Sequence, residues 1–174
     1  MKELFLISLF AVAPAAAAGP CDDPRHAQRV ILENASKPDQ LTAAIKDIYQ
    51  KEQARPDSPV AGLSDPLKAY FDENYLRGSD VAKARVALQS KPMDVETFLS
   101  VFKTFLPPGR HTDEQLRAYA QTEPDQAWQV MTRAYVGGLN RLARELSPED
   151  NARRKAILEH VEKLTCERLD GKPA

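Results

Sequence analysis

The chain has 174 residues and a formal net charge of −1, because 24 Lys and Arg residues nearly balance 25 Asp and Glu residues. A nucleic-acid-binding domain needs a basic face and an adhesive membrane-surface protein needs clustered cations, so this balance argues against both classes. The chain has the length of one domain, and its many Ala, Leu, Glu, Lys, Arg and Gln residues favour helices. Only seven glycines and no long alternating apolar pattern argue against strands, so the sequence predicts an all-α fold.

The first 18 residues are organised like a secretory signal peptide. Lys2 gives a positive start, residues 4–13 are uncharged and apolar, and Ala16 and Ala18 offer the small side chains that signal peptidase accepts. The apolar run is shorter than the roughly 20 residues that cross a bilayer as a helix. We therefore expect residues 1–18 to be cleaved and residues 19–174 to form a single exported helical domain, periplasmic or secreted, with no transmembrane segment. An uncleaved anchor and a lipoprotein are the alternatives, but Pro20 before Cys21 is a poor lipidation sequence.

Two cysteines, Cys21 and Cys166, lie near opposite ends of this domain. An even and minimal number of cysteines in an exported chain predicts a disulfide, and two cysteines allow one intramolecular pairing. Reduced thiols and an intermolecular bridge are the alternatives, whereas the missing C-x-x-C spacing argues against a redox-active pair. The sequence thus predicts a bridge between the N-terminal segment and the last helix. The bridge would close an irregular bundle of about six or seven amphipathic helices.

Apolar residues at three- and four-residue spacing predict the helices in chain order. Gly78 is expected to end one helix and Ser79 to begin the next, and Pro107 is expected to end the most apolar helix. Only Ser147 is left to connect the last two helices, which predicts a tight helical hairpin. The expected helices lie at 25–34, 41–49, 67–78, 79–88, 95–106, from 112 onward, 123–146 and 148–169.

Hydroxyl side chains mark several of the expected helix starts. Four of them are followed three residues later by Asp or Gln, which is the pattern of a capping box: Ser36, Thr112, Thr122 and Ser147. In three of these cases a proline follows within two residues, where the first turn of a helix tolerates it.

No catalytic, metal or cofactor motif stands out in the sequence. The three histidines, His26, His111 and His160, form no H-x-x-x-H or H-E-x-x-H pair, so neither a metal site nor a cofactor is expected. His160 lies off the apolar stripe of its helix and is expected to be in solvent. No serine lies in a G-x-S-x-G or S-x-x-K motif, so we do not expect an enzyme.

Four residues at two places are the first candidates for a binding surface. Arg110 and His111 follow a Pro-Pro-Gly turn, where the alternative explanation is an exposed linker. Gly137 and Gly138 interrupt a long helix, and each costs about 1 kcal/mol relative to alanine. A kink or a close backbone contact would compensate, and packing is the alternative to ligand binding there.

Export, the missing catalytic motif and a disulfide-closed scaffold together favour a non-enzymatic protein that binds another macromolecule. It would act as an inhibitor, immunity protein, chaperone or envelope accessory factor, and its partner would be a protein of the cell envelope. Trp128 and Tyr135 would line a groove beside the two glycines, with the loops 55–64 and 106–111 as further contact surfaces. The alternative is a small-molecule-binding protein or enzyme with a pocket between the helix of Trp128 and the helix that carries Phe98 and Phe105.

Overall fold

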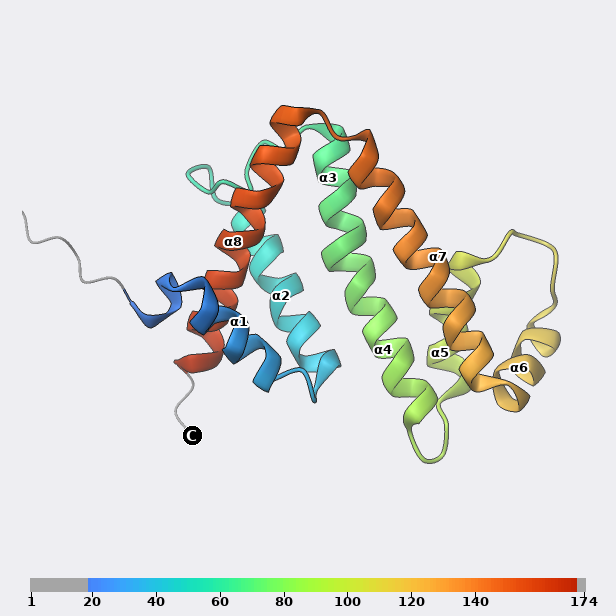
Figure 1. Cartoon of the computed structure of the whole chain (residues 1–174). Coiled ribbons are helices and arrows are strands. Elements are labelled where there is room, and N and C mark those ends of the chain that lie inside the picture. Colours follow the sequence, from blue (N-terminus) through green and yellow to red (C-terminus); the bar gives the residue numbers. More distant parts are fainter. Residues whose placement is uncertain (1–18, 172–174) are drawn as a thin grey trace, which may run out of the picture.

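The computed structural model describes residues 19–171, and the predicted signal peptide lies outside the described residues. Every regular element in the described range is helical, as the sequence predicted (Figure 1). The α-helices are α1 (Pro24–Glu33), α2 (Pro38–Gln53), α3 (Asp65–Phe71), α4 (Gly78–Gln89), α5 (Val95–Phe102), α6 (Asp113–Thr122), α7 (Pro124–Glu145) and α8 (Pro148–Asp170). Two 3₁₀ turns, η1 (Pro20–Asp22) and η3 (Lys103–Phe105), and one π-helix, η2 (Asp72–Arg77), complete them. Within residues 19–171 no helix combines the length and the apolar character that a membrane crossing needs.

The predicted disulfide is confirmed. Cys21 in η1 and Cys166 in α8 are bonded, with their Cα atoms 5.8 Å apart and a sequence separation of 145. Both cysteines are buried, and Ala27 and Val30 of α1 complete a small core around them. The bridge therefore fastens η1 and α1 to the end of α8.

Capping confirms two of the four expected helix starts. The Thr112 hydroxyl accepts from the Gln115 amide in a full capping box, and the Ser147 hydroxyl accepts from the Asp150 amide at 3.0 Å. The predictions for Ser36 and Thr122 are wrong, because the residue directly before each helix-starting proline occupies the N-cap position. A residue before proline is pushed out of the α region, so it becomes the last non-helical residue whatever its side chain.

The predicted break at Gly78 is also wrong. Gly78 has helical dihedral angles (φ −58°, ψ −37°), and α3, η2 and α4 run into one another as a continuous helix from Asp65 to Gln89. Its small size serves packing instead of chain reversal: a Cβ at this position would lie 2.7 Å from the Tyr135 hydroxyl oxygen. Because α3, η2 and α4 form one continuous helix, the described residues contain seven separate helices, which agrees with the expected bundle of about six or seven.

Two larger cores lie on either side of this long continuous helix. Figure 1 shows α7 and α8 meeting at one end and diverging, with α2 and α4 between them. The first core, called the α5–α7 core, contains Val81, Ala84, Ala87, Phe98, Leu99, Phe102, Leu116, Ala120, Ala127 and Met131. The second, called the α2–α8 core, contains Ile48, Tyr49, Val60, Leu67, Phe71, Leu146, Ile157 and Val161.

Candidate functional site

An apolar groove of about 340 Å³ lies where the two large cores meet. Its floor is the η2–α4 segment, and its two walls are α2 and α7, which both contact α4. Its lining residues are Pro38, Thr42, Ile45, Asn74, Tyr75, Gly78, Ser79, Val81, Ala82, Arg85, Trp128 and Tyr135.

The floor of the groove contains a buried hydroxyl with no partner. Ser79 is 1% exposed, and its Oγ makes no hydrogen bond within the described residues. It follows directly after the π-helix η2, and π-helical turns are frequent at functional sites. An unpaired buried hydroxyl costs about 1–3 kcal/mol, so an unpaired hydroxyl on a residue that lines a groove calls for an explanation such as a ligand.

Two of the predicted site residues, Trp128 and Tyr135, come together in the wall that α7 contributes. They are seven residues apart, so they lie on one face of the helix, and both are half-buried. The Tyr135 hydroxyl donates to the main-chain oxygen of Asn74 at 3.2 Å. Burial, with smaller effects from nearby Glu73 and Tyr70, raises the pKa of Tyr135 to about 12. Tyr135 is therefore a neutral phenol at physiological pH.

Arg85 supplies the charge at the edge of the groove. Its guanidinium carbon lies 5.6 Å from the centre of the Trp128 ring, within the range of a cation–π interaction. No other ionisable group except the tyrosine phenols lines the groove within residues 19–171, and none of the lining side chains is a carboxylate or an imidazole. The groove therefore attracts anionic groups and has no general base to activate Ser79.

The two glycines of α7 have different surroundings. A Cβ on Gly138 would lie 3.4 Å from the Glu73 carboxylate, so Gly138 leaves room for that side chain. Burial raises the pKa of Glu73, while Arg77 and Arg141 oppose the shift. A Cβ on Gly137 would meet no described atom within 4 Å, and α7 continues through both positions. Nothing in the described structure explains Gly137.

The structure places Arg110 and His111 away from this groove. Both are exposed, and the chain turns at Gly109, whose φ of +76° is a left-handed conformation that favours glycine. His111 lines a separate hollow of about 370 Å³ together with Val130. Val130 is two residues after Trp128, a rotation of about 200° around the axis of α7, so the two side chains lie on nearly opposite faces of the helix. The other residues of this hollow are Phe102, Leu106, Gln115, Leu116 and Tyr119.

Buried side chains of α5 and α7 belong together to the α5–α7 core. Phe98 and Met131 are completely buried and Phe102 is 1% exposed. The hollow beside His111 is lined by residues of all three helices α5, α6 and α7, so it lies at the edge of this core.

The loop 55–64, another predicted contact surface, is held by hydrogen bonds to side chains of α2 and α8. Arg153 of α8 donates to three of its carbonyls, including Ala61 at 2.6 Å and Gly62 at 3.1 Å. Buried Glu52 accepts from Ser58 at 2.7 Å and pairs with His160 at 2.6 Å. This pair corrects the expectation that His160 is in solvent. Because the carboxylate lies between hydroxyl and imidazole, the three residues form no Ser–His catalytic pair.

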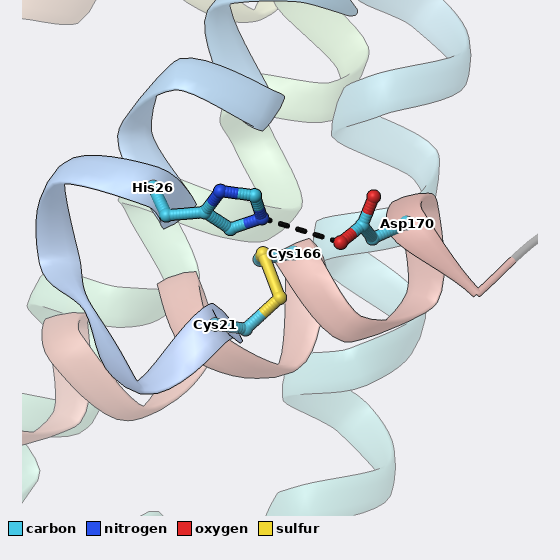
Figure 2. A group of neighbouring side chains, drawn as sticks. All are labelled: Cys21, His26, Cys166 and Asp170. Carbon is cyan, nitrogen blue, oxygen red and sulfur yellow. Dashed lines mark hydrogen bonds and ion pairs between the residues drawn. A yellow bond between two sulfur atoms is a disulfide. The ribbon is translucent and has the colours of Figure 1, made fainter. Parts of the chain in front are cut away.

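One group of side chains has the composition of a metal site, which the sequence analysis did not expect. One ligand atom from each of Cys21, His26, Cys166 and Asp170 lies within 4.8 Å of the others (Figure 2). Cys166 and Asp170 are one helical turn apart on α8, and Cys21 and His26 are five residues apart. In the sequence, only the C-x-x-x-D spacing of Cys166 and Asp170 could have suggested this group. That spacing indicates a site only when the disulfide brings Cys21 and His26 next to the end of α8.

Comparison of the chain with protein-family models, curated proteins and solved structures finds no match in any of the three. The function must therefore be argued from the groove, the hollow and the residue cluster themselves.

Proposed function

We propose that this chain is an exported, non-enzymatic protein that binds another protein, and that an acidic, apolar segment of the partner enters the groove between α2, α4 and α7. The observation that carries this proposal is the buried, unpartnered hydroxyl of Ser79 at the floor of an otherwise apolar groove. A polar atom of the partner's segment would satisfy this hydroxyl while apolar side chains cover the groove.

The charge at the groove supports an acidic segment. Arg85 lies at its edge against Trp128, and no carboxylate lines the groove within the described residues. An Asp or Glu of the partner would pair with Arg85, and the aromatic ring beside it is the type of residue that dominates protein interfaces. The volume suits a few anchoring side chains and is too small for a whole helix.

The chemistry of the groove supports binding over catalysis. Within residues 19–171 neither an imidazole nor a carboxylate lines the groove with Ser79, and burial keeps the lining phenols of Tyr75 and Tyr135 protonated by raising the pKa of each. A serine without a base is a weak nucleophile.

Export is supported by the signal-peptide pattern of residues 1–18 and by the disulfide, since disulfides persist in oxidising compartments. An envelope protein is the partner class that such a location would provide.

A peptide-display selection against the purified domain tests the proposal. Wild-type protein is expected to enrich peptides in which large apolar residues adjoin Asp or Glu. Trp128→Ala should abolish the enrichment, and Arg85→Glu should shift it toward Lys and Arg. Val130→Ala is the matched control, since Val130 lies on the other face of α7 and is 41% exposed. Trp128 is the sole tryptophan of the chain, so its fluorescence measures binding of a selected peptide directly.

The proposal is wrong if the Trp128→Ala protein selects the same peptides as the wild type. The small-molecule alternative has its own support in the hollow beside His111, where Gln115 and Tyr119 add polar groups to apolar walls. It predicts that a fragment library shifts the NMR signals of this hollow, and that His111→Ala removes those shifts without changing peptide selection.

A further inference from the structure

The cluster around the disulfide brings together ligand types that bind zinc. Cys166 and Asp170 come from the last turns of α8, Cys21 from η1 and His26 from the start of α1 (Figure 2). Two thiolates, an imidazole and a carboxylate are all zinc ligands, with bonds of about 2.0–2.3 Å to the metal. A tetrahedral site with such bonds places its ligand atoms about 3.3–3.8 Å apart, and the four atoms here already lie within 4.8 Å.

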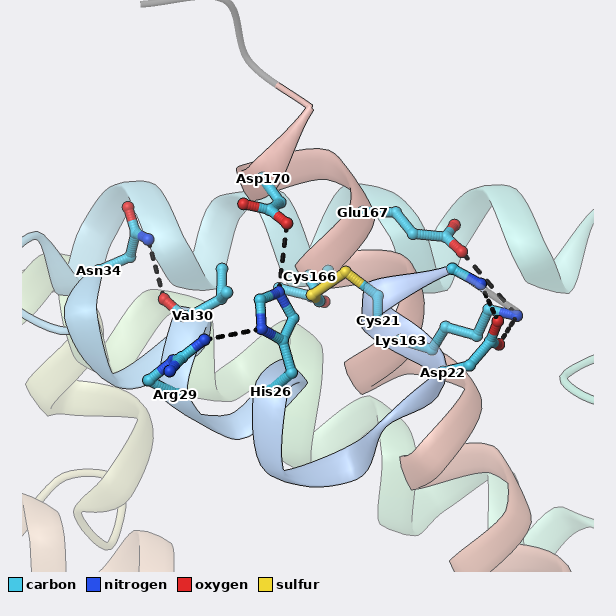
Figure 3. Close-up of a disulfide and its surroundings, with 12 residues drawn as sticks. Cys21, Asp22, His26, Arg29, Val30, Asn34, Lys163, Cys166, Glu167 and Asp170 are labelled. Carbon is cyan, nitrogen blue, oxygen red and sulfur yellow. Dashed lines mark hydrogen bonds and ion pairs between the residues drawn. A yellow bond between two sulfur atoms is a disulfide. The ribbon is translucent and has the colours of Figure 1, made fainter. Parts of the chain in front are cut away.

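The imidazole of His26 is oriented toward the centre of this cluster. Its Nε2 lies 3.2 Å from the Asp170 carboxylate, and its Nδ1 lies 2.9 Å from Nη2 of Arg29 (Figure 3). Because a guanidinium only donates, Nδ1 accepts from Arg29, and the N–H at Nε2 donates a hydrogen bond to the Asp170 carboxylate. Metal binding through Nε2 requires this proton to move to Nδ1 and Arg29 to turn away, which its exposed position allows.

We propose that Cys21, His26, Cys166 and Asp170 form a redox-controlled binding site for Zn²⁺, which opens when the disulfide is reduced. A dithiol reductant transfers two electrons and two protons to the disulfide, yielding two thiols and the oxidised dithiol. Zn²⁺ then replaces the two thiol protons, which pass to water, and binds both thiolates with His26 and Asp170. A disulfide oxidant takes two electrons from the thiolates and two protons from water and leaves as a dithiol, which restores the Cys21–Cys166 bond, removes both sulfur ligands and releases the metal.

The surroundings leave the four ligands available for one ion. Asp22, the carboxylate next to Cys21, pairs with Lys163 and points away from the cluster in Figure 3. The sulfurs are buried, whereas the Asp170 side chain is 46% exposed and the His26 side chain 22%. Solvent therefore reaches Asp170 and His26 directly, and Cys21 also lines a hollow of about 290 Å³ with His160 and Lys163. This inference does not depend on the groove or its partner.

Zinc titration of the reduced and the oxidised domain tests the proposal. A chromophoric chelator present as competitor reports the affinity, and Co²⁺ reports the geometry through its thiolate charge-transfer and tetrahedral d–d absorption. Reduced wild-type protein is expected to bind one Zn²⁺, and the oxidised protein none at the same concentration. His26→Ala should weaken the affinity at least tenfold, and Asp170→Asn should weaken it less. His111→Ala is the control, because His111 lines a hollow that contains none of the four ligands.

Circular dichroism of the same samples keeps the test decisive if reduction loosens the fold. Zinc should then restore helical signal to the reduced wild type and leave a Cys21→Ser, Cys166→Ser double variant unchanged. The proposal is overturned if reduced His26→Ala and wild type bind zinc equally, since two thiolates alone would explain the binding. Equal binding by the oxidised protein, or no binding by the reduced protein, also overturns it.

Discussion

Replacing both cysteines with serine should destabilise the domain by about 5 kcal/mol. The bridge closes a loop with a sequence separation of 145 residues, and the chain-entropy model assigns such a loop about 17 cal/mol/K in the unfolded state. At 25 °C this entropy corresponds to about 5 kcal/mol, which is comparable with the whole stability of many domains. For a domain of this length the loss lowers the melting temperature by about 15 °C.

The structure also indicates that α1 is the first segment to lose protection when the bridge is removed. Without the bridge, α1 is held to α8 by the small core of Ala27, Val30 and Leu169 and by the partly exposed pair of His26 with Asp170. Partly exposed ion pairs contribute about 0–1 kcal/mol, so they cannot replace the bridge. Amide protons of α1 should therefore exchange faster than those of the two larger cores.

Urea unfolding followed by circular dichroism measures this effect against the oxidised wild type. The double variant should show a lower midpoint and a larger slope m, because its unfolded chain is no longer cross-linked and exposes more surface. A loss below about 1 kcal/mol, with α1 amides protected as in the wild type, would refute the entropic argument.

Three further substitutions test local packing and charge. Gly78→Ala should lower the free energy of unfolding by about 1–3 kcal/mol, because the new methyl group lies against the Tyr135 hydroxyl. Adding Tyr135→Phe should recover most of this loss, which a double-mutant cycle of urea unfolding curves measures. Gly137→Ala should instead raise the melting temperature and add about 0.5–1 kcal/mol, since a methyl group there meets no described atom. Burial alone would raise the pKa of Glu52. Its hydrogen bonds outweigh this effect and hold the pKa below the ordinary 4.5, and the hydrogen bond with His160 contributes most. Glu52→Gln should therefore cost about 1–3 kcal/mol at pH 7, and unfolding curves at several pH values should show the difference shrinking as pH falls below 4.5.

The elements that the sequence predicted well are those whose signals are local. Both long helices match their expected ranges within about two residues. The start of α8 was predictable because one residue, Ser147, both precedes the proline and carries a capping hydroxyl. At Ser36 and Thr122 these two properties fall on different residues, and the backbone restriction before proline decides the boundary.

The groove was only half predictable for a related reason. The spacing of Trp128 and Tyr135 on one helix face is visible in the sequence, and so is a glycine at 78. That Gly78 receives the Tyr135 ring instead of ending a helix is a tertiary contact between segments 57 residues apart in the chain. The same contact, together with the π-helical turn before it, places Ser79 at the floor, where no local pattern marks it.

The two candidate sites lie in different cores, and this separation has a physical consequence. The groove lies between the α2–α8 core and the α5–α7 core, whereas the sulfurs belong to the third, small core around α1. Contact between them passes through α2, which packs against both α4 and α8. Reduction of the disulfide frees the unfolded chain and loosens α1, but it removes no residue that lines the groove. Redox state should thus change the free energy of unfolding more than the affinity for a groove ligand, because a bond that acts through the unfolded state leaves native contacts in place.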